Sequence, residues 1–491
     1  MRTEVQERRP LERAEVEEKE RERGAREAYV VFCCLWAVAT LFHLAADRDW
    51  DRSLLQFALT SSAVWLLVKP SSIPRLLILA LLQIMAVGVD APHVSNHWLF
   101  TAFVNVAIVG SAALAMTGER RLSIEKAQLY AGFAPVVRIG VIILYFFAVL
   151  HKLNTDFLAP EGSCGTIFYL ALQDRLPFLP DSSLLQTASI YGTILVEAAI
   201  PILLCLRKTR MLGVFLGAAF HSVVGFNPVS TFYDFSSMLF AVFILFAPEG
   251  FSAEVRRNYD RLKAYLRDRT AALDAAPYSG TRLLRLSSWA VLCLLLLVVS
   301  SVLLRGSDYV LLFWFAYSSL YVVTSGAALF RKQEAAAVPV TGLFRPRHAV
   351  LLVIPALIFL NGLSPYLGLK TENSFAMFSN LRTEGGQTNH LFIPAHTQLF
   401  DFQQDLVEVT GSSAAQLQVL ADEQKLLPYL EFRIRAGYRQ TDSVTYIRNG
   451  KERIVPRVAE DPELGRPVPL HLKKLLWFRP VDNVEVQECR H

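Results

Sequence analysis

Long apolar segments alternate with short polar ones between residues 28 and 369. The apolar residues form continuous runs, such as Val291–Leu304, and lack the one-sided periodicity of helices in soluble proteins. A helix needs about 20 predominantly apolar residues to cross a bilayer. The pattern therefore predicts a mainly α-helical protein, a polytopic transmembrane helix bundle of about 9–11 spans. The segments assigned as spans are residues 28–46, 53–68, 73–90, 97–116, 134–151, 184–206, 211–226, 231–247, 288–304, 308–330 and 348–369.

Two polar regions flank the predicted bundle. Residues 1–27 hold eight Arg or Lys and nine Glu, which excludes a secretory signal and predicts a charged cytoplasmic tail, either a solvated helix or a disordered segment. Residues 370–491 are richer in polar residues and predict a small α+β domain. Asn449-Gly450 predicts a hairpin turn, and residues 467–486 predict a final helix or strand pair. Alternation predicts strands at 416–420, 430–434 and 443–447.

The loop charges orient the predicted bundle. One alternate set of loops holds twenty Lys and Arg, and the other set holds five. Because Lys and Arg are enriched in cytoplasmic loops, the chain is expected to begin in the cytoplasm, and the 370–491 domain is expected to be extracytoplasmic. In the cytoplasmic set, residues 251–269 form a basic amphipathic stretch that is expected to lie on the lipid headgroups.

Composition agrees with a membrane protein and narrows the functional classes. Of the 491 residues, 53% are hydrophobic and 19% are charged, whereas soluble domains average about 25% charged residues. The net charge of +5 comes from basic residues in loops and does not indicate nucleic-acid binding. Six cysteines without a CxxC pair form neither a disulfide scaffold nor a redox motif. Cys164 and Cys489 would both lie outside and could form a disulfide.

Several polar side chains collect on the outer side of the predicted bundle, where ionisable groups are costly and often functional. Lys152 follows a long apolar span on the side that has few lysines. If Lys152 faces the bundle, loss of hydration favours its neutral form, which can act as a base. The alternative is a lysine whose side chain extends to the membrane surface and keeps its ammonium group in water. His97 opens the fourth span and could shuttle a proton, or could be an ordinary interfacial histidine. The other members are His151, His221, Asn227 and Asp234, with Gln83 and Glu197 deeper.

A metal site is not expected. His93 and His97 are four residues apart, which is a ligand spacing on a helix. The sequence offers no HExxH motif and no third ligand nearby.

Four segments resemble the vitamin K-dependent gamma-carboxylase superfamily, in particular its microbial branch, the HTTM (horizontally transferred transmembrane) proteins. Ser95–Leu99 (SNHWL) is similar to the family's Asn-His pair at the start of a membrane helix. Tyr145–Phe157 (YFFAVLHKLNTDF) is similar to its Tyr-Phe…Lys-Leu segment. Glu197–Asn227 resembles the helix pair that follows, and Ser374–Gly386 (SFAMFSNLRTEGG), running to Asn389-His390, resembles the segment after the last span.

This resemblance implies a chemistry. The family's carboxylases deprotonate vitamin K hydroquinone with a lysine. The anion reacts with oxygen, and a strongly basic alkoxide forms on the way to the epoxide. This alkoxide removes the γ-proton of a protein glutamate, and carbon dioxide then adds to the carbanion. The resemblance implies that Lys152 is the catalytic base and His97 a second catalytic residue. The substrate-binding residues that it implies are Asn96, His221, Asn227, Arg382 and His390.

The implied co-substrates are reduced vitamin K or another quinol, oxygen and carbon dioxide. The implied partners are membrane lipid and a Glu-containing protein or peptide on the outer side. The family's animal carboxylases carry a much larger outer domain than residues 370–491, so quinol epoxidation is more firmly expected than glutamate carboxylation. The second hypothesis is a non-catalytic HTTM membrane protein that binds lipid or quinone, or acts as a partner or export factor. A transporter is the third, although inverted repeats are not evident.

Overall fold

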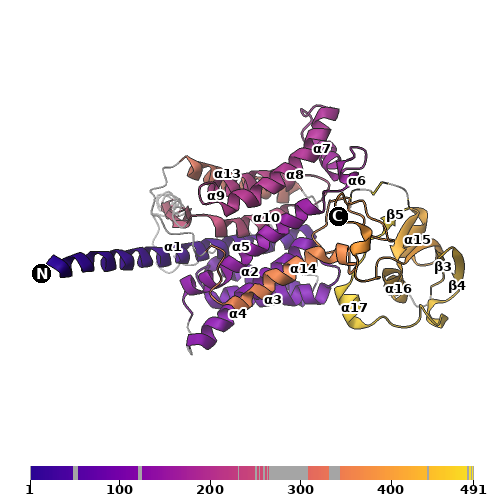
Figure 1. Ribbon diagram of the computed structural model, residues 1–491, viewed down its shortest axis with the longest axis horizontal. Helices are drawn as coiled ribbons and strands as arrows, with labels where there is room; N and C mark the ends of the chain where they lie inside the picture. Colours follow the sequence, from indigo (N-terminus) through magenta and orange to yellow (C-terminus); the bar gives the residue numbers. More distant parts are fainter. Residues whose placement is uncertain are drawn as a thin grey trace, which may run out of the picture. The chain divides into compact units, whose positions relative to one another are not determined.

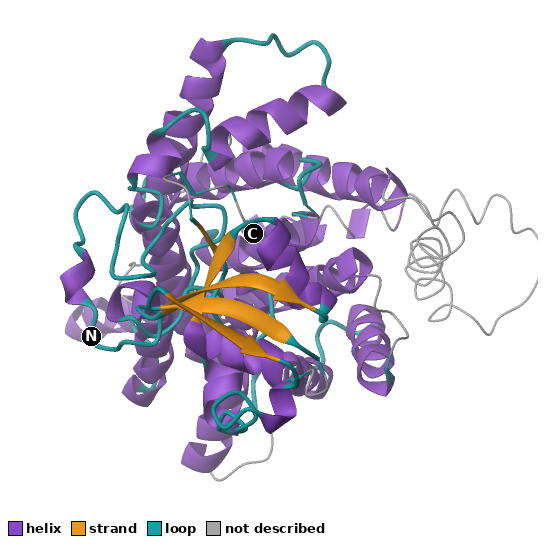
Figure 2. Ribbon diagram, turned by 90° about the vertical axis from the view of Figure 1, so that its right-hand side faces the viewer, coloured by secondary structure: helices purple, strands orange, loops and turns teal. Residues whose placement is uncertain are grey.

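The computed structural model describes residues 2–47, 53–119, 124–230, 232–248, 308–330, 343–438 and 442–483, with scattered residues between 251 and 264 and Val486, Gln487 and Cys489. The described chain is mainly α-helical, and a small antiparallel sheet lies in its C-terminal part (Figures 1 and 2). It divides into two compact units, interleaved in sequence, which are described separately. The first unit comprises Met1–Ala86, Thr101–Ile142 and Ala199–Pro355, and the second comprises Val87–Phe100, Ile143–Ala198 and Ala356–His491.

The first unit is built from helices in the part of the chain that the structure describes. The longest, α1 (Arg2–Asp47), joins the charged tail to the first apolar segment without a break (Figure 1), so the helical form of the predicted tail is the one observed. Ser53 caps α2, because its hydroxyl accepts a hydrogen bond from Gln56 N at 3.3 Å. The other helices are α2 (Leu54–Val68), α9 (Arg210–Val224), α10 (Tyr233–Phe243) with η1 (Ile244–Phe246), η3 (Ala349–Leu352), α13 (Asp308–Leu329), and the larger parts of α3 (Ile73–Asp90), α4 (Asn96–Glu119) and α5 (Lys126–Leu150).

A buried polar network links three helices of the first unit. Trp36 Nε1 donates to Gln83 Oε1 at 3.1 Å and to Asn105 Oδ1 at 3.2 Å. Gln83 Nε2 donates to Thr40 Oγ1 at 2.9 Å. Because its amide oxygen and nitrogen are both bonded, Gln83 is a structural link between α1, α3 and α4.

The second unit combines helix ends with the C-terminal sheet. It holds the end of α5, followed by α6 (Thr155–Leu158) and α7 (Cys164–Arg175), most of α8 (Ser183–Cys205) and most of α14 (Val353–Leu367). The sheet has the strand order β4-β3-β1-β2-β5, and each neighbouring pair is antiparallel (Figure 2). The C-terminal elements are η4 (Ala395–Thr397), β1 (Leu406–Ser412), α15 (Ala415–Asp422), β2 (Lys425–Pro428), α16 (Tyr429–Gly437), β3 (Val444–Arg448), β4 (Lys451–Val455), η5 (Val458–Glu460), α17 (Leu470–Leu475) and β5 (Val481–Asp482).

The predicted spans coincide with helices, except for residues 288–304, which lie outside the described residues. Seven described helices are long and apolar enough to cross a membrane, or eight if the bent pair Tyr233–Phe246 and Phe251–Arg257 forms one span. The helices α2 and α9 have 15 residues each, roughly 22 Å at 1.5 Å per residue, which is shorter than the ~30 Å hydrocarbon core. Among the described residues the structure thus shows seven candidate spans, or eight with the bent pair, where the sequence predicted ten. Most of the predicted amphipathic stretch 251–269 also lies outside the described residues.

Two of the three predicted strands are wrong. Residues 416–420 lie in α15, where Leu417 and Leu420 are buried. Residues 430–434 lie in α16, where Tyr429, Glu431, Phe432, Ile434 and Ala436 are buried. The buried apolar positions 417 and 420 in α15, and 429, 432 and 436 in α16, lie three or four residues apart, which is the helical period.

The prediction of a hairpin is confirmed. Residues 443–447 lie in β3 apart from their first residue, and Asn449 and Gly450 join β3 to β4 with φ of 51° and 70°, as two-residue hairpin turns require. In its described residues, the 467–486 region holds one short helix, α17, and one strand, β5.

Candidate functional site

Lys152 lies just beyond the end of α5 with 8% of its side chain exposed. Its Nζ lies 2.8 Å from Oε2 of Glu197 on α8, a side chain that is 13% exposed. Nζ also donates to the Ala148 carbonyl oxygen at 3.2 Å and lies 5.9 Å from the centre of the Phe157 ring. An ammonium group has three N–H donors, so these two polar contacts leave one donor for a further acceptor.

Glu197 is the residue that sequence reasoning noted but did not assign. The sequence signal was partial: a carboxylate within a long apolar helix requires a partner, but no local pattern identifies Lys152, 45 residues earlier, as that partner. Tyr145, two turns before Lys152 on α5, also interacts electrostatically with Glu197. The structure therefore brings one amine, one carboxylate and one phenol to the same buried place in the second unit.

His151 is fully buried beside Lys152 but is committed to the fold. Its Nε2 lies 3.1 Å from the Ser374 carbonyl oxygen, which can only accept, so Nε2 carries the proton. Its Nδ1 then accepts from the Tyr366 hydroxyl at 2.9 Å. With both ring nitrogens bonded, His151 positions the chain after α14.

Asn154 is the centre of the segment after Lys152. Its Nδ2 donates to the carbonyl oxygens of His151 and Ser379 at 2.7 and 2.6 Å. Its Oδ1 accepts from Phe157 N at 2.8 Å and so caps α6. Through Asn154, the Lys-Leu-Asn part of the Tyr145–Phe157 segment therefore links the end of α5 to residues 373–380.

Residues 373–380 form a loop of unusual backbone conformation, which we call the left-handed loop. Four of its residues, none of them glycine, have φ between 53° and 63°; they are Asn373, Phe375, Phe378 and Asn380. Such residues are costly and are kept only where surrounding contacts hold them. Asn361 Nδ2 donates to Asn373 O at 2.7 Å, and Asn389 Nδ2 donates to Asn380 O at 2.7 Å. The segment that resembles the family is thus held by side-chain amides from several elements.

Asn96 and His97, at the start of α4, are both buried. Asn96 Oδ1 accepts from Phe375 N at 2.6 Å, so Asn96 is another support of the left-handed loop. His97 Nε2 lies 3.2 Å from the Ser95 hydroxyl.

Arg382 and His390 follow the left-handed loop. Arg382 Nη1 donates to Asp482 O at 3.3 Å, while its Nε is buried without a hydrogen-bond partner among the described residues. His390 Nδ1 accepts from Phe392 N and Ile393 N, so its Nε2 is the protonated nitrogen that donates to Leu150 O at 3.0 Å. Burial lowers the pKa of His390. Arg382 therefore has one unsatisfied buried donor, whereas His390 is bonded at both ring nitrogens.

His221 and Asn227 belong to the first unit. His221 packs against the rings of Phe235 and Phe243, with centroid distances of 5.3 and 6.2 Å. Asn227 Oδ1 accepts from Val229 N at 3.1 Å and shapes the turn after α9.

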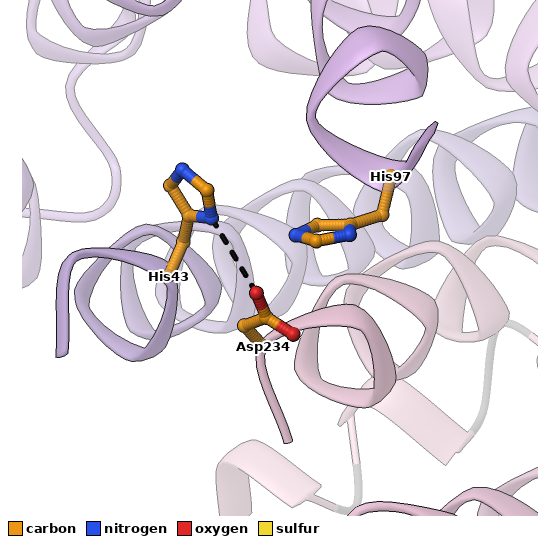
Figure 3. Close-up of side chains that lie close together, drawn as sticks. All are labelled: His43, His97 and Asp234. Atoms are coloured by element: carbon orange, nitrogen blue, oxygen red, sulfur yellow. Dashed lines mark ion pairs between the residues drawn. The ribbon is translucent and has the colours of Figure 1, made fainter. Parts of the chain in front are cut away.

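An ionisable pair that the sequence did not reveal lies in the same first unit. His43 Nδ1 on α1 is 3.6 Å from Asp234 Oδ2 on α10, and both side chains are almost wholly buried (Figure 3). Asp234 was noted as an intramembrane carboxylate, and His43 is the partner that its burial requires.

Cys164 and Cys489 form a disulfide. The bond ties the start of α7 to the C-terminal residues of the second unit across 325 positions. Asn380 supports the same junction, since its Oδ1 accepts from Cys164 N at 3.0 Å and its Nδ2 donates to Gln487 O at 2.8 Å.

No protein-family model matches the chain, and neither a search of curated proteins nor a search of solved structures finds a match. The resemblance therefore rests on the residue patterns alone. The geometry adds that the Tyr145–Phe157 and Ser374–Gly386 segments meet within the second unit.

Proposed function

We propose that this chain is an integral-membrane enzyme that removes a proton from an apolar quinol, as members of the vitamin K-dependent gamma-carboxylase superfamily do. The observation that supports this function is the buried Lys152–Glu197 pair, 2.8 Å between Nζ and Oε2. An ion pair taken out of water costs more in desolvation than an apolar contact of the same size, so it is a poor choice for stability alone. A base that removes the proton of a weakly acidic hydroxyl needs such a site, where water is excluded.

The pair can accept one proton without creating an isolated charge. Glu197 takes a proton from the Lys152 ammonium, the neutral amine rotates about its Cε–Nζ bond so that its lone pair faces the quinol hydroxyl, and Nζ takes the proton of that hydroxyl. The proton ends on Glu197, the lysine is an ammonium again, and its positive charge stabilises the quinol anion. Phe157 and the helices α5 and α8 shield this place from water, since the side chains of Lys152 and Glu197 are only 8% and 13% exposed. Oxygenation to an epoxide, and carboxylation of a glutamate bound through Arg382, are the further reactions that the resemblance implies.

The proposal places the protein in the cell membrane with its N-terminus in the cytoplasm and residues 370–491 outside. The disulfide Cys164–Cys489 supports this topology, because disulfides persist in oxidising compartments and are rare in the cytosol. Cys205, at the end of α8 next to a basic loop, is a free thiol. The disulfide on the outer side and the free thiol beside a basic loop both agree with the orientation that the distribution of Lys and Arg predicts.

The test is quinol turnover by the purified full-length protein in detergent. Reduced vitamin K and oxygen are supplied, and epoxide is followed chromatographically. Wild type and Lys451→Ala, whose lysine is exposed on β4, should form epoxide, whereas Lys152→Ala should form none. Epoxide from Lys152→Ala at the wild-type rate would contradict the role of this lysine. Absence of epoxide in every folded variant, with an active carboxylase alongside, would contradict quinol epoxidation.

A non-catalytic membrane protein is the second candidate, and one observation favours it. Asn96 Oδ1 accepts from Phe375 N, and the two ring nitrogens of His390 bond to Phe392 N, Ile393 N and Leu150 O. Part of the family pattern therefore serves to hold the fold. Under this reading Lys152→Arg, which keeps a cation opposite Glu197, preserves function in cells, whereas a base role requires the lysine itself.

A further inference from the structure

Residues 385–400 of the second unit form an exposed apolar segment. They include no Asp, Glu, Lys or Arg between Glu384 and Asp401. Most of their large apolar side chains are exposed, with Phe392 72% and Leu399 75% exposed, while Ile393 packs against the core. Leu391 and Phe400 are also exposed. Several large apolar side chains held together at a surface mark a place where a partner or a membrane binds.

Backbone hydrogen bonds attach this segment to the ends of two long apolar helices. Leu399 N and Phe400 N both donate to the carbonyl oxygen of Leu367, the last residue of α14, at 3.0 Å. Leu391 N donates to Leu153 O, three residues after the end of α5, at 3.0 Å. The exposed side chains therefore stand at the level where these candidate spans end.

The helix α17 occupies a similar position relative to a third helix. Lys474 Nζ donates at 2.7 Å to the carbonyl oxygen of Val89, in the last turn of α3. At the two ends of α17, Leu470 is 72% exposed and Leu475 is 65% exposed. A short helix with exposed leucines and lysines resembles segments that lie in the plane of a membrane surface.

We propose that residues 385–400 and α17 together form a lipid-binding collar that enters the boundary between headgroups and acyl chains. A bilayer is the partner that fits, because the exposed surface of α14 in the same unit is also apolar, with Leu357 47% and Leu360 51% exposed. The collar continues that surface beyond the end of the helix. The charge-free composition of 385–400 suits the acyl boundary, where each buried charge is costly.

The collar can be tested with spin labels on the full-length chain in phosphatidylcholine vesicles. The label is placed at Phe392→Cys or at Leu399→Cys, in a background where the cysteines outside the disulfide are Ser. The matched control is Ile454→Cys, because Ile454 is equally exposed, at 71%, but lies on the edge strand β4. Collision with oxygen, which concentrates in the bilayer, is compared with collision with a water-soluble nickel complex.

Labels at 392 and 399 should collide at least three-fold more with oxygen relative to nickel than the label at 454. An oxygen-to-nickel ratio equal to the control would overturn the collar. Shielding from both reagents would also overturn it, because that result means a protein covers the segment. A second measurement needs no substitution: a lipid with a photoreactive group just below the headgroup should crosslink to wild-type peptides from residues 385–400 and not to those from β4.

Discussion

At the scale of single residues, the Lys152–Glu197 pair has the clearest consequence for stability. Glu197→Gln leaves a buried ammonium without its counter-charge, and breaking a buried pair from one side typically costs about 3–5 kcal/mol. We expect this loss in the free energy of unfolding, measured by denaturation in detergent. The double variant Lys152→Met, Glu197→Leu should recover most of the stability while forming no epoxide. A Glu197→Gln variant as stable as wild type would show that the pair is not formed in the folded protein.

Glu372, just beyond α14, gives a pH dependence with a definite sign. Burial raises the pKa of Glu372 to about 7, and the nearby Glu384 and Glu431 act in the same direction. The folded state therefore keeps a proton that the unfolded chain has lost. This contribution to stability is complete below pH 4.5 and is lost as the pH rises to about 7.

The measurement is the free energy of unfolding of wild type and Glu372→Gln between pH 5 and 7.5. The difference between the two curves removes the contributions of other groups, such as His390. We expect wild type to lose about 1–2 kcal/mol relative to the variant across this range. Parallel curves would mean that Glu372 titrates normally.

At the scale of elements, Asn154 joins the end of α5 to the left-handed loop. Asn154→Asp keeps the shape and the cap on Phe157 N but replaces a donor by an acceptor opposite two carbonyl oxygens, those of His151 and Ser379. Each unsatisfied buried carbonyl costs about 1–3 kcal/mol. The variant should unfold at a clearly lower denaturant concentration. Asn449→Asp, at the exposed hairpin turn, is the matched control and should change the midpoint little.

The long apolar helices could be predicted from the sequence because long apolar runs occur mainly in helices that span a membrane. Residues 416–420 and 430–434 were assigned wrongly, since a five-residue stretch fits a period of 2 and a period of 3.6 about equally well. The left-handed conformation of Phe375 and Phe378 contradicts their residue preference. It depends on bonds from Asn96 and Asn154, which are distant in sequence, so no local pattern could reveal it. For the same reason, the sequence identified Lys152 as a candidate functional residue but did not reveal that it pairs with Glu197.

At the scale of the whole molecule, the cysteines divide into two chemical classes. Cys164 and Cys489 are joined in the second unit, while Cys33, Cys34 and Cys205 are free thiols among the described residues. Cys33 and Cys34 lie within an apolar helix, so Cys205, which is exposed at the end of α8, is the one that marks a membrane side. With the N-terminus in the cytoplasm, α8 runs inward and Cys205 faces the cytoplasm.

This division predicts opposite labelling of two thiols by a membrane-impermeant maleimide. In intact cells that expose the outer face of the membrane, wild type should stay unlabelled and should become labelled at Cys205 only after permeabilisation. The substitution Cys164→Ser releases the thiol of Cys489, which is half-buried. In this variant Cys489 should be labelled without permeabilisation. Cys205→Ser in the wild-type background should abolish the labelling that depends on permeabilisation at this site. If Cys205 reacts in intact cells and the released Cys489 does not, the chain has the opposite orientation. The proposed carboxylation of an outer glutamate then loses its support, because the left-handed loop and Arg382 would face the cytoplasm.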